Sequence, residues 1–136
     1  MTQTYCVKAD VEAIWPPAEL LASVDDDTNG ALSATEEGYI TRAIEQAANH
    51  LNSRLEMRYR VSDLASNTWC RDANAAIAAY WLATRRGEAA PDHLEQQYDA
   101  YLMTLAEISA GRMKVPGVAE SFDGRPEVIN LEARLG

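Results

Sequence analysis

Cysteine is scarce in this 136-residue chain, which contains only Cys6 and Cys70. Two thiols so far apart in sequence indicate neither a disulfide framework nor a metal knuckle. We therefore expect a reducing, cytosolic setting with both thiols structural. Long apolar runs are also missing, so no segment is expected to span a membrane. The first ten residues, MTQTYCVKAD, lack the basic and apolar stretches of a secretory signal.

Positive charge is the next shortage. The chain has 12 Lys and Arg against 21 Asp and Glu, which gives a net charge of -9 and a pI of about 4.6. Such a surface repels a nucleic-acid backbone, so a tight DNA- or RNA-binding groove is not expected. Two interpretations of the charge stay open: an ordinary soluble acidic protein, or a surface that lies near DNA without binding it.

Apolar residues recur every three or four positions along three segments, which is the spacing of amphipathic helices. These segments cover residues 35–59, 69–86 and 91–111. The middle segment is rich in alanine, whose small side chain permits close helix–helix approach. No segment shows a convincing alternation of apolar and polar residues. The sequence therefore predicts a small all-α bundle with three long helices in a single domain.

One or two short helices are expected before the long ones. Pro16 and Pro17 separate residues 8–15 from residues 17–24, and Pro17 suits the first turn of the second segment. Each segment is long enough for one short helix.

The C-terminal residues after the last helix form a different kind of segment. Residues 116–136 have too few apolar positions in phase for another core helix. They are nevertheless more apolar than a disordered tail usually is. We therefore expect a helical domain over residues 1–115 and an extended C-terminal arm over residues 116–136. The residues expected to contact a partner are Phe122, Val128, Ile129 and Leu131.

An acidic loop, DDDTNGALSATE at residues 25–36, has the ligand spacing of an EF-hand. Gly30 falls where the loop turns sharply and Leu32 where it would anchor to the core. Candidate calcium ligands at positions one, three, five, seven, nine and twelve are Asp25, Asp27, Asn29, Ala31 through its carbonyl, Ser33 and Glu36. The sequence thus allows a structural calcium ion.

The same loop has a second interpretation. Asp, Asn and Gly favour turns, and Ser33 followed by Glu36 is typical of a capping box at a helix start. An EF-hand also usually has a paired partner loop, and the sequence contains no second one. Both hypotheses stay open: a calcium loop, or a turn followed by a helix cap.

Enzymatic activity is not expected. The only histidines, His50 and His93, are interpreted as surface or capping residues rather than catalytic bases, and neither cysteine has a histidine near it in sequence. The sequence contains no phosphate-binding loop, nucleophile elbow or zinc-ligand spacing.

Several motifs follow one another in a recognisable order. They are the start at Tyr5 with Ala9-Asp10-Val11-Glu12-Ala13, and the predicted helices ITRAIEQAANHLNSRLEMRY and QYDAYLMTLAEISAGRMKV. The alanine-rich middle helix lies between them. Together these motifs cover about residues 5–115, and they resemble the Mu-like head–tail connector (adaptor) proteins of tailed bacteriophages.

The resemblance implies a non-enzymatic structural role. Such adaptors form a homo-oligomeric ring beneath the portal protein, extend the DNA channel and dock neck or tail completion proteins. DNA would pass through without specific binding, and no membrane would be involved. The protein would be made in the host bacterial cytoplasm and would reside in the virion neck. The rival hypothesis is a small calcium-binding module with a single EF-hand-like loop.

Overall fold

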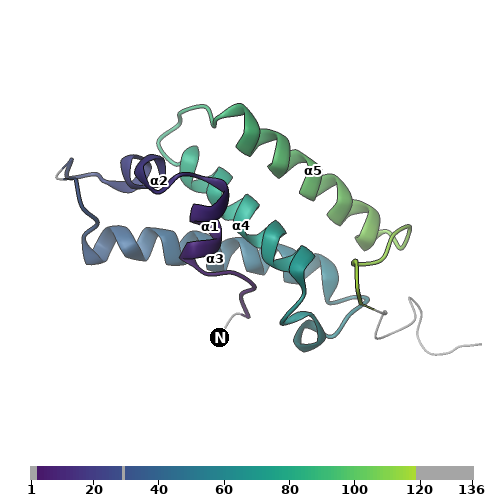
Figure 1. Ribbon diagram of the computed structural model, residues 1–136. Helices are drawn as coiled ribbons and strands as arrows, with labels where there is room; N and C mark the ends of the chain where they lie inside the picture. The colour runs from purple at the N-terminus through teal and green to yellow at the C-terminus, as the bar shows by residue number, and fades with distance from the viewer. Residues whose placement is uncertain (1–2, 29, 119–136) are drawn as a thin grey trace, which may run out of the picture.

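The computed structural model describes residues 3–28 and 30–118, and all regular secondary structure in this part of the chain is helical (Figure 1). The elements are α1 (Lys8–Ile14), α2 (Pro17–Val24), α3 (Ala34–Leu55), a short 3₁₀ helix η1 (Val61–Leu64), α4 (Thr68–Ala83) and α5 (Asp92–Ser109). The prediction of an all-α bundle with three long and two short helices is confirmed. The sequence did not indicate η1. The expected contact residues of the arm, Phe122, Val128, Ile129 and Leu131, lie outside the described residues.

Local sequence signals explain where the helices begin. Ser33 caps α3, since its Oγ accepts a hydrogen bond from the Glu36 amide at 3.2 Å. The Glu36 carboxylate in turn accepts one from the Ser33 amide at 2.9 Å, which completes the predicted capping box. Asn67 caps α4 by accepting from the Cys70 amide at 2.9 Å. Pro17 occupies the first turn of α2, where its missing N–H has no cost.

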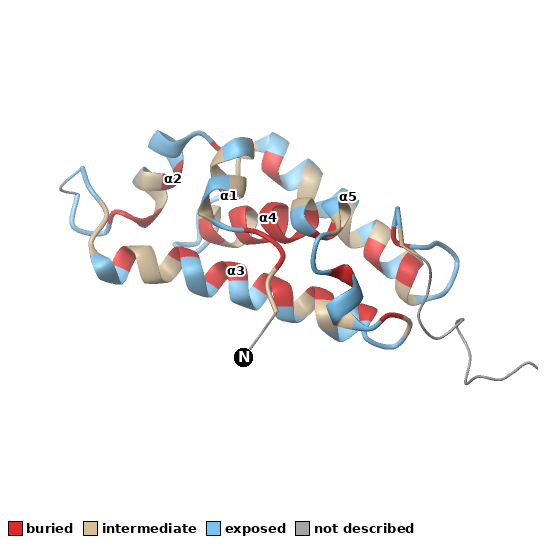
Figure 2. Cartoon of the chain, turned by 60° about the horizontal axis from the view of Figure 1, so that its bottom comes forward, coloured by how far each residue is buried: buried red, intermediate tan, exposed pale blue. Residues whose placement is uncertain are grey.

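The alanine-rich helix α4 lies at the centre of the bundle. It contacts α1, α2, α3 and α5, and residues 73–79 are all buried (Figure 2). A helix that is apolar all round must be covered on every side. The sequence predicted a single apolar stripe for this helix. Instead the alanine-bearing faces are buried too, while the bulky Trp69 and Trp81 are only partly buried.

The far ends of α3 and α5 are joined to each other. The Arg58 Nε donates to the Ser109 carbonyl at 3.4 Å, and the Val115 amide donates to the Tyr59 hydroxyl at 2.9 Å. Val115 is itself buried against the core. The packed core therefore extends to the last residue of the predicted helical domain.

Candidate functional site

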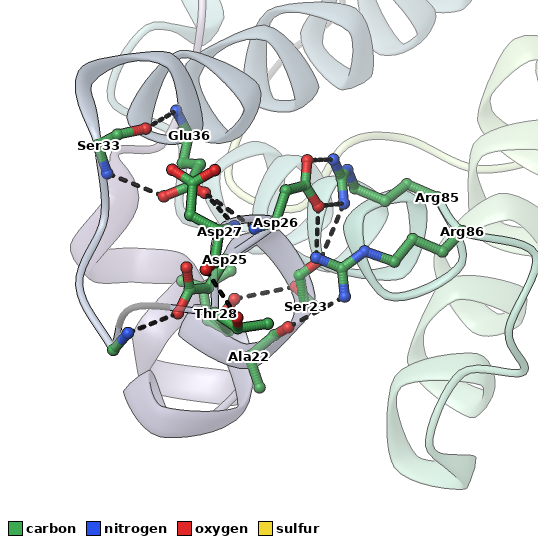
Figure 3. Close-up of polar contacts among 12 residues, drawn as sticks. Ala22, Ser23, Asp25, Asp26, Asp27, Thr28, Ser33, Glu36, Arg85 and Arg86 are labelled. Atoms are coloured by element: carbon green, nitrogen blue, oxygen red, sulfur yellow. Dashed lines mark hydrogen bonds and ion pairs between the residues drawn. The ribbon is translucent and has the colours of Figure 1, made fainter.

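The acidic loop between α2 and α3 is closed by one carboxylate. Glu36 is only 2% exposed, and its Oε2 accepts hydrogen bonds from the backbone amides of Asp26 at 2.8 Å and Asp27 at 3.3 Å (Figure 3). Its Oε1 accepts from the Ser33 amide. One side chain thus ties both ends of the loop to the first turn of α3, where the helix dipole favours negative charge.

Asp25 shapes the turn inside the loop. Its Oδ2 accepts from the Gly30 amide at 2.8 Å, and Gly30 has a φ of 79°. That left-handed conformation strains a residue with a Cβ, so glycine is favoured there. Thr28 also has a positive φ, of 52°, although it is β-branched.

Asp26 is the residue that fastens the loop to the rest of the bundle. Its carboxylate pairs with Arg85 at 2.8 Å and with Arg86 at 2.5 Å (Figure 3). Hydrogen bonds from Arg85, and then from Arg86, lower the pKa of Asp26 to about 2. The carboxylate is therefore ionised at neutral pH and holds two guanidinium groups against the loop.

The two arginines also bind the end of α2. Arg85 donates to the Ser23 carbonyl at 3.0 Å, and Arg86 donates to the Ala22 carbonyl at 3.2 Å. The Arg85 guanidinium also lies over the Tyr39 ring, 4.7 Å from its centroid. The ends of α2 and α4 and the start of α3 are thereby held together.

The sequence placed these arginines differently. The helix predicted over residues 69–86 would end with Arg85 and Arg86 in its last turn. In the structure α4 ends at Ala83, so both side chains lie beyond it and serve the C-terminus of α2. The sequence analysis did not identify Asp26 as a functional residue, because position two of a calcium-binding loop supplies no ligand. The adjacent arginine pair was the available signal for an acidic partner.

The predicted calcium ligands have several different roles in the structure. Glu36 and Asp25 bind backbone amides, Ser33 caps α3, and Asp27 and Ala31 are exposed. Asn29 lies outside the described residues. Within residues 3–28 and 30–118, no group of three or more His, Cys, Asp or Glu side chains is arranged to hold a metal. A calcium ion would require Glu36 to give up its backbone donors.

The buried thiols fit a structural role. Burial raises the pKa of both Cys6 and Cys70 to about 12, so each stays protonated at neutral pH.

His50 is half-buried, and its ring meets Trp81 edge-on with centroids 6.2 Å apart. Burial, and then the charge of Arg54, lowers the pKa of His50.

These features define a small helical bundle whose polar cluster joins the ends of α2 and α4 to the start of α3. A family model described as "Bacteriophage Mu, Gp36" matches residues 5–127, and the chain belongs to that family. It is therefore a Mu-like phage protein. No curated protein matches the chain significantly. Among the described residues, no helix combines the length and apolarity needed to cross a bilayer.

Proposed function

We propose that this protein is a non-enzymatic head–tail adaptor. In this proposal, copies form a ring beneath the portal, extend the DNA channel and dock neck or tail completion proteins. The observation that carries the proposal is membership of the phage Mu family over residues 5–127. A structural or morphogenetic role in the virion fits a bundle whose principal polar cluster holds helix ends together.

Charge and sequence support the finer assignment. A net charge of -9 favours a channel through which DNA passes without being held. The C-terminal residues Phe122, Val128, Ile129 and Leu131 supply apolar side chains for a partner surface on the portal or a neighbouring copy. The protein would thus reside in the virion neck after synthesis in the host cytoplasm.

Two experiments test the adaptor function. In a phage that lacks this protein, we expect DNA-filled heads and complete tails that fail to join, as seen by electron microscopy. Purified full-length protein should also add a ring of density beneath isolated portals. Normal infectious virions made without the protein would overturn the proposal.

A structural calcium ion in the acidic loop is the alternative proposal. It is favoured by the position of Asp25 and Glu36, which approach the loop from the two helices that flank it (Figure 3). Calcium would replace the backbone donors of Glu36 and fix the angle between α2 and α3. The ion would then stabilise the loop, whether the protein is an adaptor or a small calcium-binding module.

Titration calorimetry decides the calcium proposal. Wild type should show calcium-dependent heat, and Glu36→Gln should show much less because one hard oxygen is lost. Thermal unfolding with calcium or with chelator gives a second measurement, since a bound ion raises the midpoint. No heat at millimolar calcium together with an identical midpoint would remove the proposal.

A further inference from the structure

The end of the molecule where α3 and α5 finish concentrates positive charge. The chain has 12 Lys and Arg, of which Arg125 and Arg134 lie outside the described residues. Half of the others fall within residues 54–63 and 107–114, which we call the basic end: Arg54, Arg58, Arg60, Arg112 and Lys114. The basic end also holds three carboxylates, Glu56, Asp63 and Glu107, so it is net positive in a strongly acidic chain.

Exposed apolar side chains accompany this charge. Met57 is 77% exposed and Met113 is 43% exposed, both within the basic end, and Met103 on α5 is 71% exposed. The Arg58–Ser109 and Tyr59–Val115 hydrogen bonds bring the two segments of the basic end together. Met and Arg are enriched in protein–protein interfaces, and Met adapts its shape to a partner surface. The combination therefore favours a protein partner over a phosphate backbone.

The opposite end of the molecule is acidic. Residues 9–41 contain eight carboxylates and no lysine or arginine. We call residues 19–37 and 85–88 the acidic end. Its seven carboxylates are opposed by Arg85, by Arg86 and by Lys8, whose Nζ lies 3.1 Å from the Glu37 carboxylate, so the acidic end is net negative. Figure 1 shows the acidic loop at one end of α3 and the finish of α5 near the other. A 22-residue helix separates these ends by about 33 Å.

We propose that the basic end of one copy docks on the acidic end of a second copy. Because the two surfaces differ, the contact is head-to-tail, which is the kind of contact that closes a ring when the rotation between copies permits. Opposite charges would set the orientation, and Met57 and Met113 would supply buried apolar area. This inference rests on the proposed adaptor ring and identifies which surfaces join its subunits.

The charge pattern exceeds what α3 needs for its own stability. Carboxylates at a helix start and an arginine in its last turn complement the helix dipole, which accounts for Glu36, Glu37 and Arg54. Lys114 and the exposed methionines lie outside α3, so the dipole of that helix does not explain them. Intersubunit contact explains both.

A mixing experiment tests the contact. Arg54→Glu with Lys114→Glu makes the basic end net negative. Glu19→Lys, Asp27→Lys and Glu88→Lys together make the acidic end net positive, even with Lys8 counted there. All five side chains belong to exposed residues. Each variant alone should self-associate at least ~tenfold more weakly than wild type in low salt, because like charges then meet. A 1:1 mixture should recover association, since every contact between unlike variants is again complementary.

Matched substitutions separate the specific contact from general charge. Arg42→Glu makes the same change at an exposed residue in the middle of α3 and should alter association less than ~threefold. Met57→Ser with Met113→Ser should weaken association even in high salt, where surface charge is screened. Sedimentation velocity of the full-length chain gives the masses, and circular dichroism checks that each variant folds.

Any of three results would overturn the inference. The wild type would self-associate neither at high concentration nor on portals, the charge-reversed variants would associate as well as the wild type, or the 1:1 mixture would fail to recover association. Loss of DNA binding without loss of self-association would assign the basic end to nucleic acid instead. Portal binding by a non-associating wild type would leave the adaptor function standing while this contact falls. Charge-dependent self-association without portal binding would support this contact and count against the adaptor function.

Discussion

The side-chain oxygen of Asn74 accepts a hydrogen bond from the Tyr5 backbone amide at 2.9 Å, although the two residues lie far apart in sequence. Asn74 is fully buried in the central helix α4, and its amide nitrogen donates to the Ile44 carbonyl at 3.0 Å. One buried side chain thus joins the N-terminal segment, α3 and α4. Buried polar groups that satisfy each other in this way specify a particular packing.

Replacing Asn74 by Ala should be strongly destabilising. The Tyr5 amide loses its acceptor and Asn74's own volume becomes a cavity, so we expect a loss of about 2–4 kcal/mol in the free energy of unfolding. Urea denaturation followed by circular dichroism measures the change. Gln46→Ala, at an exposed position on α3, is the control and should change stability by less than about 0.5 kcal/mol. Equal effects of the two substitutions would contradict the prediction.

Three glycine-to-alanine substitutions should separate backbone strain from packing. Gly111 and Gly87 both have a φ of 83°, but a Cβ at Gly111 would lie 2.5 Å from Arg58 Nη2, whereas a Cβ at Gly87 meets nothing within 4 Å. Gly87→Ala should cost roughly 1–2 kcal/mol from strain alone. Gly111→Ala should cost more, because the Arg58 guanidinium must also move. Gly38→Ala, within α3 and in open space, should stabilise by about 0.5–1 kcal/mol.

The Asp26–arginine cluster should make stability depend on acid pH. The pKa of Asp26 falls from 3.8 in the unfolded reference to about 2 in the fold. A depressed carboxyl pKa stabilises the fold above the unfolded value, and this contribution is lost as pH falls from about 4 to about 2. We expect Asp26→Asn to remove that part of the pH dependence, so the two stability curves converge near pH 2. A carboxyl pKa of about 4 by NMR titration would contradict the assignment.

The buried carboxylate of Glu36 should matter for stability in the absence of any metal. Glu36→Ala leaves the amides of Asp26, Asp27 and Ser33 without their acceptor, so we expect a loss of about 1–3 kcal/mol in chelator-containing buffer. Glu37→Ala is a suitable control at the next position along the chain. The Glu37 side chain makes a partly exposed ion pair with Lys8, and this pair should contribute less than about 1 kcal/mol to stability. Thermal unfolding of both variants measures the difference.

Removal of residues 119–136 should separate folding from assembly. The core closes at Val115, and the Val118 amide donates to the Val115 carbonyl at 3.2 Å, so the shortened chain keeps the described packing. We expect an unchanged unfolding midpoint and loss of binding to portals. Phe122→Ser with Ile129→Ser in the full-length chain should give the same loss. Unchanged assembly on portals would show that the arm is not the contact surface.

The local signals in the sequence predicted most of the secondary structure. Apolar spacing and the Ser33–Glu36 box act over three or four residues, so they can be read without knowing the fold. The sequence was less informative about burial. It indicated one apolar stripe on α4, because small alanines carry little hydrophobic signal on their own. Only the surrounding helices show that every face of α4 between residues 73 and 79 is covered.

In the acidic loop, too, some contacts follow from local sequence and others from tertiary packing. Its sequence determined the turn at Gly30 and the cap at Ser33, because these depend on backbone conformation and on neighbours a few residues away. The tertiary structure decided that Asp26 would bind Arg85 and Arg86, and that Glu36 would hold both ends of the loop. Such contacts require α2, α3 and α4 to converge. No short-range pattern encodes that convergence, since it follows from packing three helices around one core.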